Sequence, residues 1–145
     1  AHHNWTVSQI AFIAADVSAK SMRASDSKSS SIYRHCIRLT NYSNRYDKVL
    51  KLSNIKRVGV APRAGRVGLP EDAHSKAADV DCSDYFIGID KPASASAFKG
   101  TWEHSWHIGN KVFFEDLYHT LCGDVDRHTI PTRLSLGHNE LQLKA

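Results

Sequence analysis

The residues with the clearest chemical potential lie in one short window, residues 101–123, TWEHSWHIGNKVFFEDLYHTLCG. It contains a His-x2-His pair and a His-x2-Cys pair, separated by eleven residues. Neutral imidazole and thiolate are ligands that zinc prefers, and zinc sites use pairs at such spacings. All four groups can meet at one ion only if the first pair lies in a tight turn. The candidate zinc ligands are His104, His107, His119 and Cys122.

A second group of residues could hold a harder cation. Asp79, Asp81 and Asp90 are close together in the sequence, and carboxylate oxygens suit magnesium. Beside a basic surface, such a site would support metal-dependent hydrolysis of phosphate esters, because the metal activates water and stabilises the leaving oxygen. No cofactor other than zinc or magnesium is expected.

Nucleophilic catalysis by a serine or cysteine cannot be assigned from the sequence. Serine, cysteine, histidine and aspartate are all present, but nothing in their spacing selects a catalytic set. The catalytic residues therefore stay unassigned, and whether the protein is an enzyme stays open.

The positive charge of the chain is concentrated in residues 34–66. This segment has nine basic residues and one acid, Asp47, which gives it a charge of about +8 in a chain of net charge +4. Basic side chains with interleaved aromatics suit phosphate contact and base stacking. The alternative is that these residues are solvated faces of strands. The candidate phosphate or nucleic-acid contacts are Arg34, Arg38, Lys48, Lys51, Lys56, Arg57, Arg63, Arg66, Tyr33, Tyr42 and Tyr46.

The segment that follows, residues 71–90, is acidic. It contains six acidic residues and a single lysine, Lys76. The acidic segment could pair with the basic one inside the fold. That pairing would remove the argument for a nucleic-acid partner and favour a structural or protein-interaction subunit.

The elements that must position the central window can be predicted from its pattern. Residues 101–108 alternate apolar and polar, which indicates a half-buried strand. Asn110 is a good helix N-cap and Gly123 a typical residue after a helix, so we expect a helix over 111–122. Its expected apolar stripe is Phe113, Leu117 and Leu121, with Phe114 and Tyr118 beside it and Glu115, Asp116 and His119 outside it.

Patterns elsewhere predict further elements. A capping box at Thr6 and Gln9 indicates a helix over residues 7–22, and Pro70 with two following acids indicates a helix over residues 70–78. We also expect a loop at 24–31, an exposed loop at 61–69, and strands at 32–39 and 84–90. A hairpin is expected near 48–60, although its KVLKL segment fits a helical turn equally well. A C-terminal hairpin with a four-residue loop is expected over 129–143.

These elements lack regular strand–helix–strand alternation. The expected fold is therefore α+β, a mainly antiparallel sheet with two to three packed helices, in a single domain over residues 1–145. No stretch is long and apolar enough to span a membrane. Three cysteines without a CxxC pair argue against a disulfide scaffold and favour a cytoplasmic location.

The sequence thus favours a small soluble basic domain that binds nucleic acid or another phosphate-rich partner. The alternatives are a metal-dependent hydrolase of phosphate esters and a structural or protein-interaction subunit. The oligomeric state is not predicted.

Overall fold

The centre of the fold is a five-stranded sheet with the strand order β1-β2-β3-β5-β4. The structure is a computed structural model and describes residues 5–56, 62–91 and 101–145. Three neighbouring strand pairs are parallel, whereas β4 and β5 are antiparallel. The strands are β1 Val7–Ile13, β2 Cys36–Ser43, β3 Ala77–Asp81, β4 Arg133–Gly137 and β5 Glu140–Leu143.

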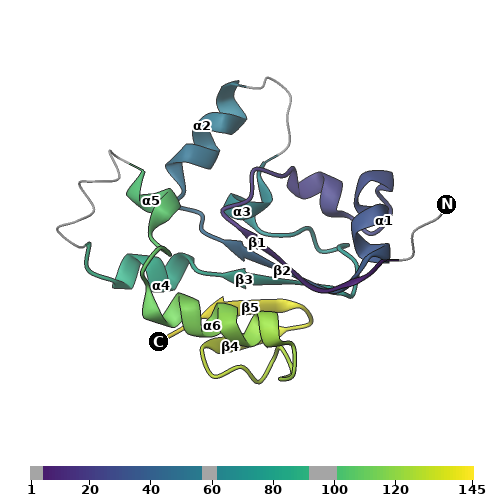
Figure 1. Ribbon diagram of the computed structural model, residues 1–145. Coiled ribbons are helices and arrows are strands. Elements are labelled where there is room, and N and C mark those ends of the chain that lie inside the picture. The colour runs from purple at the N-terminus through teal and green to yellow at the C-terminus, as the bar shows by residue number, and fades with distance from the viewer. Residues whose placement is uncertain (1–4, 57–61, 92–100) are drawn as a thin grey trace.

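Helices lie on both faces of this sheet (Figure 1). α6 lies along one face, and α1 and α3 lie on the other. No helix of the described residues is long and apolar enough to cross a membrane. The helices are η1, a 3-10 helix, Ala19–Met22, then α1 Ser27–Arg34, α2 Lys48–Lys56, α3 Ala64–Val67, α4 Ser83–Gly88, α5 Trp102–Ser105 and α6 Lys111–Cys122.

Each face of the sheet has its own apolar core, because successive side chains of a strand point to opposite faces. Val80 belongs to the larger core with Trp102, Trp106 and Phe113, on the side of α6. Ala77 belongs to the smaller core, on the other side, with residues of η1, α1 and β2. Both cores are needed because a parallel sheet has to be covered on both faces.

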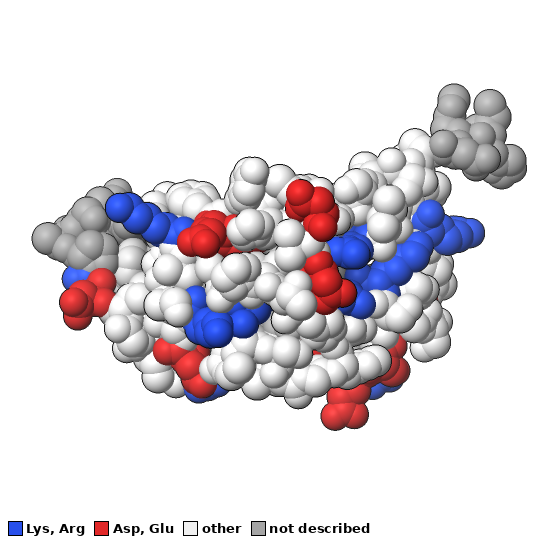
Figure 2. Space-filling model, turned by 90° about the horizontal axis from the view of Figure 1, so that it is seen from below, with Lys and Arg blue, Asp and Glu red and all other residues white. Residues whose placement is uncertain are grey.

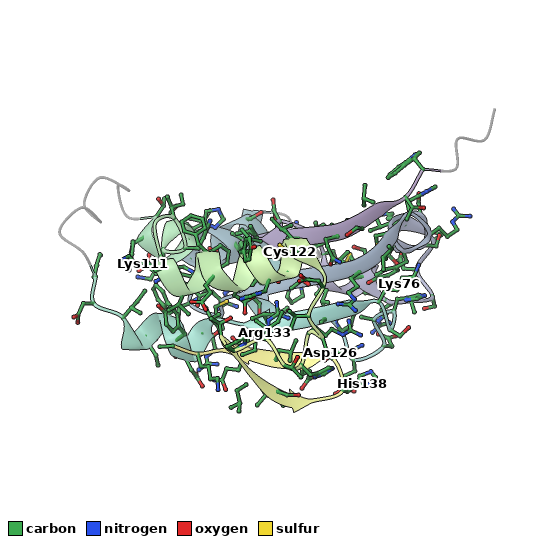
Figure 3. The ribbon with its side chains drawn as sticks, turned by 60° about the horizontal axis from the view of Figure 1, so that its bottom comes forward. Lys76, Lys111, Cys122, Asp126, Arg133 and His138 are labelled. Atoms are coloured by element: carbon green, nitrogen blue, oxygen red, sulfur yellow. The ribbon has the colours of Figure 1, made fainter. Side chains whose placement is uncertain are left out.

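A buried ion pair ties α6 to the C-terminal hairpin. Arg133 donates from Nε to Asp116 Oδ2 at 2.9 Å and from Nη2 to Asp116 Oδ1 at 2.8 Å. Tyr42 and Thr132 also donate hydroxyl hydrogen bonds to this carboxylate, at 2.7 and 2.8 Å. Figure 3 shows Arg133 between the hairpin and α6. Burial of the two charges is tolerated because each is paired and further hydrogen-bonded.

The expected mainly antiparallel sheet is wrong. The sheet is mixed and mostly parallel, and only the β4–β5 hairpin within the described residues gives it an antiparallel pair. α1 connects β1 to β2, and α2 and α3 lie between β2 and β3, so the strand–helix–strand alternation is present. Several of these helices are only one or two turns long, which leaves little periodicity in the sequence.

The predicted helices at 7–22 and 70–78 are wrong. Residues 7–13 form β1 and residues 19–22 form η1. β1 meets apolar groups on both faces, so its residues show no clean alternation and resemble a helical stripe. Residues 77–81 form β3, in which Ala77 and Ala78 are buried under closely packed neighbours. Pairing with β2 overrides the helical preference of alanine there.

Four other predicted elements are also corrected. The supposed loop at 24–31 contains the start of α1, capped by Asp26, and α1 occupies the first part of the predicted strand 32–39. The second part of that strand, residues 36–39, is confirmed as the start of β2. The supposed strand at 84–90 is α4. The supposed hairpin at 48–60 begins with α2, which agrees with the helical alternative for KVLKL. Residues 57–60 of that hairpin lie outside the described residues.

The central window contains one wrong and one confirmed prediction. Residues 101–108 are not a strand, because α5 and a following turn bury Trp102 and Trp106 at helical spacing. The helix at 111–122 is confirmed as α6, with the Asn110 side chain accepting from Phe113 N and Gly123 in the left-handed region. The C-terminal hairpin is confirmed too, although its loop is shorter than predicted.

The buried face of α6 differs from the predicted stripe. Phe113, Asp116 and Thr120 are buried, whereas Tyr118 and Leu121 are exposed. The inward position of Asp116 follows from its ion pair with Arg133, which a hydrophobic pattern does not reveal.

Candidate active site

A buried aspartate and a histidine meet at the edge of the sheet where the parallel strands end. His104 Nδ1 lies 2.6 Å from Asp47 Oδ2. Asp47 follows β2 along the chain, and His104 follows β3, the next strand. The side chain of Asp47 is 2% exposed and that of His104 is 31% exposed, so one partner is enclosed and the other can reach a ligand.

The start of α2 fixes the Asp47 carboxylate. Oδ1 accepts a hydrogen bond from Leu50 N at 2.9 Å, which is the N-cap interaction of a helix that begins at Lys48. One carboxylate oxygen is therefore held by the helix, and the other remains for His104. Asp47 performs two roles at once, as a helix cap and as the partner of an imidazole.

The segment that carries His104 is anchored to the segment that carries Asp47. Asn44 donates from Nδ2 to the carbonyl of Glu103 at 3.1 Å, and Lys48 forms an ion pair with the Glu103 carboxylate at 3.1 Å. On the other side of the segment, Trp106 packs against Phe113 with ring centroids 5.6 Å apart. These contacts hold the imidazole over the carboxylate.

The contact with Asp47 selects one tautomer of His104. The carboxylate can only accept a hydrogen bond, so Nδ1 carries the proton and donates. Nε2 then has a free lone pair, and it makes no hydrogen bond to any residue of the described segments. The arrangement can accept a proton at Nε2, and Asp47 would stabilise the imidazolium that forms.

A small cavity of about 10 Å³, room for about one water molecule, lies beside this pair and is lined by the end of β1. Ile13 and Ala14 line it together with His104 and Asp47. Ala14 has a φ of 49°, and Gly65 lies so close that a Cβ there would be 2.7 Å from Ala14 C. The close approach of Gly65 thus fixes the turn after β1 next to His104.

His107 lines the same cavity, one helical turn after His104. Burial lowers the pKa of His107, and the neighbouring His104 lowers it further, against the opposing effect of Asp47. His107 therefore stays neutral at physiological pH and adds no positive charge beside His104.

Ser43 and Cys82, two residues of nucleophilic type, line this cavity, but neither is hydrogen-bonded to His104. The Ser43 hydroxyl donates to Asp79 at 2.9 Å. The Cys82 thiol contacts Val80 O, and burial raises its pKa well above the ordinary value, so it stays protonated. No serine or cysteine within the described ranges is hydrogen-bonded to His104 Nε2.

The predicted zinc ligands are not brought together. His104 and His107 share one cavity, whereas His119 lines another, beside Arg38 and Arg127. Cys122 is an exposed free thiol. Among the residues that the structure describes, no three histidine, cysteine or acidic side chains are placed to hold a metal ion.

The predicted magnesium ligands are likewise separated. Asp79 and Asp81 lie on β3, whereas Asp90 lies beyond the end of α4 and is exposed. Asp79 instead accepts hydrogen bonds from Asn41 and Ser43, at 2.6 and 2.9 Å.

The predicted nucleic-acid contacts are scattered. Tyr33 and Tyr42 are each 3% exposed and offer no face for a base to stack on. Arg63 is buried in an ion pair with Asp16, Arg57 lies outside the described residues, and Lys56 lies at the end of α2. The remaining exposed candidates are Arg34, Lys48, Lys51 and Tyr46, and the partly buried ones are Arg38 and Arg66.

Ion pairs within the fold neutralise part of the positive charge of the basic segment, residues 34–66. Arg45 contacts Asp84 at 2.8 Å and Asp81 at 3.9 Å, which links the basic and acidic segments. Figure 2 shows that basic and acidic side chains are interspersed on the face seen from below. Nucleic-acid binding stays a prediction that these observations do not support.

Comparison of the chain with protein-family models, with curated proteins and with solved structures finds no match. Function must therefore be inferred from the Asp47–His104 geometry.

Proposed function

We propose that the protein is a hydrolase in which His104 acts as a general base oriented by Asp47. The observation that carries the proposal is the 2.6 Å contact between His104 Nδ1 and the buried Asp47 carboxylate. A buried carboxylate that fixes the tautomer of a partly exposed imidazole is the arrangement of acid and base in Ser-His-Asp hydrolases. A positioned general base contributes typically about 10²–10⁴-fold to a rate.

The reaction class that fits this pair is acyl transfer from an ester or amide to water. A water molecule gives a proton to His104 Nε2 as its oxygen attacks the carbonyl carbon. His104 then gives that proton to the leaving alcohol or amine as the bond between that group and the carbonyl carbon breaks, which releases the acid. Asp47 keeps its negative charge throughout and stabilises the imidazolium.

The order of the two residues along the chain supports the proposal. Asp47 follows one parallel strand and His104 follows the next, both at the carboxyl end of the sheet. This resembles α/β-hydrolases, in which the nucleophile comes first along the chain, then the acid, then the histidine. The likeness is one of arrangement, so the function is argued from the site itself.

The described residues support water as the nucleophile. No serine or cysteine of the described segments is hydrogen-bonded to His104 Nε2, and the cavity beside His104 has room for about one water molecule.

The test is hydrolysis of 4-nitrophenyl acetate, followed by mass spectrometry of the quenched protein. We expect activity above buffer that falls about 10²-fold or more in His104→Ala and Asp47→Asn. The matched control is His128→Asn, because His128 lies away from the site and contacts Ser135. An acetyl adduct would locate the nucleophile on the chain, whereas turnover without an adduct would indicate direct attack by water.

Two outcomes would contradict the proposal. One is a wild-type rate equal to that of buffer. The other is hydrolysis that His104→Ala and Asp47→Asn leave unchanged. Equal losses in all three variants, including His128→Asn, would point to general damage to the fold and would also count against the proposal.

A further inference from the structure

A second cavity, of about 640 Å³, lies away from the Asp47–His104 pair and has no role in the proposed hydrolysis. Its floor contains Ala77, Asp79 and Asp81, which alternate along β3 with residues that face α6. It therefore opens on the sheet face opposite α6. Its walls are the segment that precedes β3 and the turn between β4 and β5. Figure 3 labels His138 at that turn.

The cavity has apolar walls and a lining rich in carboxyl groups. Apolar contacts come from Val67, Leu69, Pro70, Leu136 and Leu141. The ionisable residues that line it are, apart from His138, carboxylates, and no lysine or arginine is among the lining residues. The carboxylates are Glu71, Asp79, Asp81 and Glu140. Such a concentration of carboxyl groups stands out in a chain of net charge +4.

One of these carboxylates is rigidly held. Asp79 accepts from Asn41 Nδ2 at 2.6 Å and from Ser43 Oγ at 2.9 Å. Gly68, with a φ of 85°, brings the chain so close that a Cβ there would be 2.9 Å from Asp79 Oδ2. Burial raises the pKa of Asp79 to about 7, and the charge of Asp81 adds to this effect. A cation beside Asp79 would offset both effects, and a perturbed carboxyl in a cavity is a mark of a binding site.

The spacing of the carboxylates selects the kind of cation. Within the described residues no three of them converge on one point, so a bare metal ion is not held. The charges are instead distributed around a volume that lies in the usual range for small-molecule sites. Arg45 approaches Asp81 at 3.9 Å but is itself half exposed, so it neutralises that lining only in part.

We propose that this cavity binds a small organic cation, an alkylammonium or guanidinium compound with a short apolar chain. The charged end lies among Asp79, Asp81 and Glu140, and the apolar part lies against Leu69, Pro70 and Leu136. The site is independent of the hydrolase proposal.

The test is isothermal titration calorimetry of the whole chain with 1,4-diaminobutane and with its uncharged counterpart, 1,4-butanediol. We expect saturable binding of the diamine, weaker in high salt, and none of the diol. Glu140→Gln and Asp79→Asn should each weaken binding about fivefold or more, the effect of losing one favourable charge pair. The matched control is Glu115→Gln, which removes one exposed carboxylate from α6.

Glu140 is exposed, so its replacement tests the site without endangering the fold, and thermal melts check the folding of Asp79→Asn. The proposal is refuted if the diamine shows no saturable binding. It is also refuted if the diol binds equally well, or if Glu115→Gln weakens binding as much as Glu140→Gln does, because the diamine would then act as a general counter-ion.

Discussion

Replacing Asp47 with asparagine would reverse the hydrogen bond at the centre of the proposed site. Leu50 N donates to Oδ1 of Asp47, so the amide oxygen of the replacement side chain must stay at that position to keep the helix cap. The amide nitrogen then occupies the position of Oδ2, 2.6 Å from His104 Nδ1 in the native protein. Because that nitrogen donates, His104 must accept at Nδ1 and carry its proton on Nε2. A protonated Nε2 cannot act as a base.

The expected cost is large in rate and small in stability. In Ser-His-Asp hydrolases the same change lowers turnover about 10⁴-fold, which corresponds to about 5.5 kcal/mol in the activation free energy. Asparagine caps helices about as well as aspartate, so the free energy of unfolding should change by less than about 1 kcal/mol. The two quantities are measured by ester hydrolysis and by urea unfolding of Asp47→Asn and the wild type.

The tautomer itself is measured by ¹⁵N NMR of the imidazole. We expect a protonated Nδ1 in the wild type and a protonated Nε2 in Asp47→Asn. The same tautomer in both proteins, or hydrolysis within about twofold of the wild type, would refute the reasoning. Asp47→Ala is the comparison, because it also removes the cap and should lose about 1 kcal/mol of stability.

Three further predictions test other parts of the structure. Asp116→Ala leaves the buried Arg133, 1% exposed, without its partner, and should cost about 3–5 kcal/mol in urea unfolding. Replacing both residues, as Asp116→Leu with Arg133→Met, should recover only part of that loss, because the Tyr42 and Thr132 hydroxyls still lose their carboxylate acceptor. The pKa of Asp79 is raised from 3.8 to about 7, so the folded protein holds a proton that the unfolded chain has lost over this range. Stability should therefore fall by up to about 4 kcal/mol as the pH rises from about 4 to about 7, and denaturant midpoints of Asp79→Asn should lack this slope. Gly65→Ala places a methyl group 2.7 Å from Ala14 C, and thermal unfolding should show a loss of about 1–3 kcal/mol.

Local signals identify two parts of the fold correctly. Asn110 and Gly123 mark the ends of α6 by capping, which depends on the backbone within a few residues. The C-terminal hairpin is likewise detectable because its strands are neighbours in the chain. The helix predicted for residues 7–13 is wrong, because their strand conformation depends on pairing with β2, whose residues lie far along the chain.

The site is harder to predict than the fold. Asp47 and His104 are 57 residues apart, and nine histidines give many such combinations. In the sequence, Asp47 stands out only as the lone acid in a basic segment. A usable signal is present, because Asp47 stands directly before KVLKL, the segment that begins α2, and aspartate is a favourable helix N-cap. That signal gains meaning only once β2 is known to be a parallel strand whose carboxyl end lies at the site.

The strand order also has a consequence for how the chain folds. β4 and β5 can pair as soon as both exist, through a two-residue turn at residues 138–139. Every other strand pair joins distant segments, as far apart as Val80 and Leu141. Loop closure of this kind is slow, so folding should be limited by assembly of the parallel strands, on the scale of about milliseconds to seconds. Until then Asp47 and His104 remain on separate pieces of chain, and the site is formed only when β3 has joined β2.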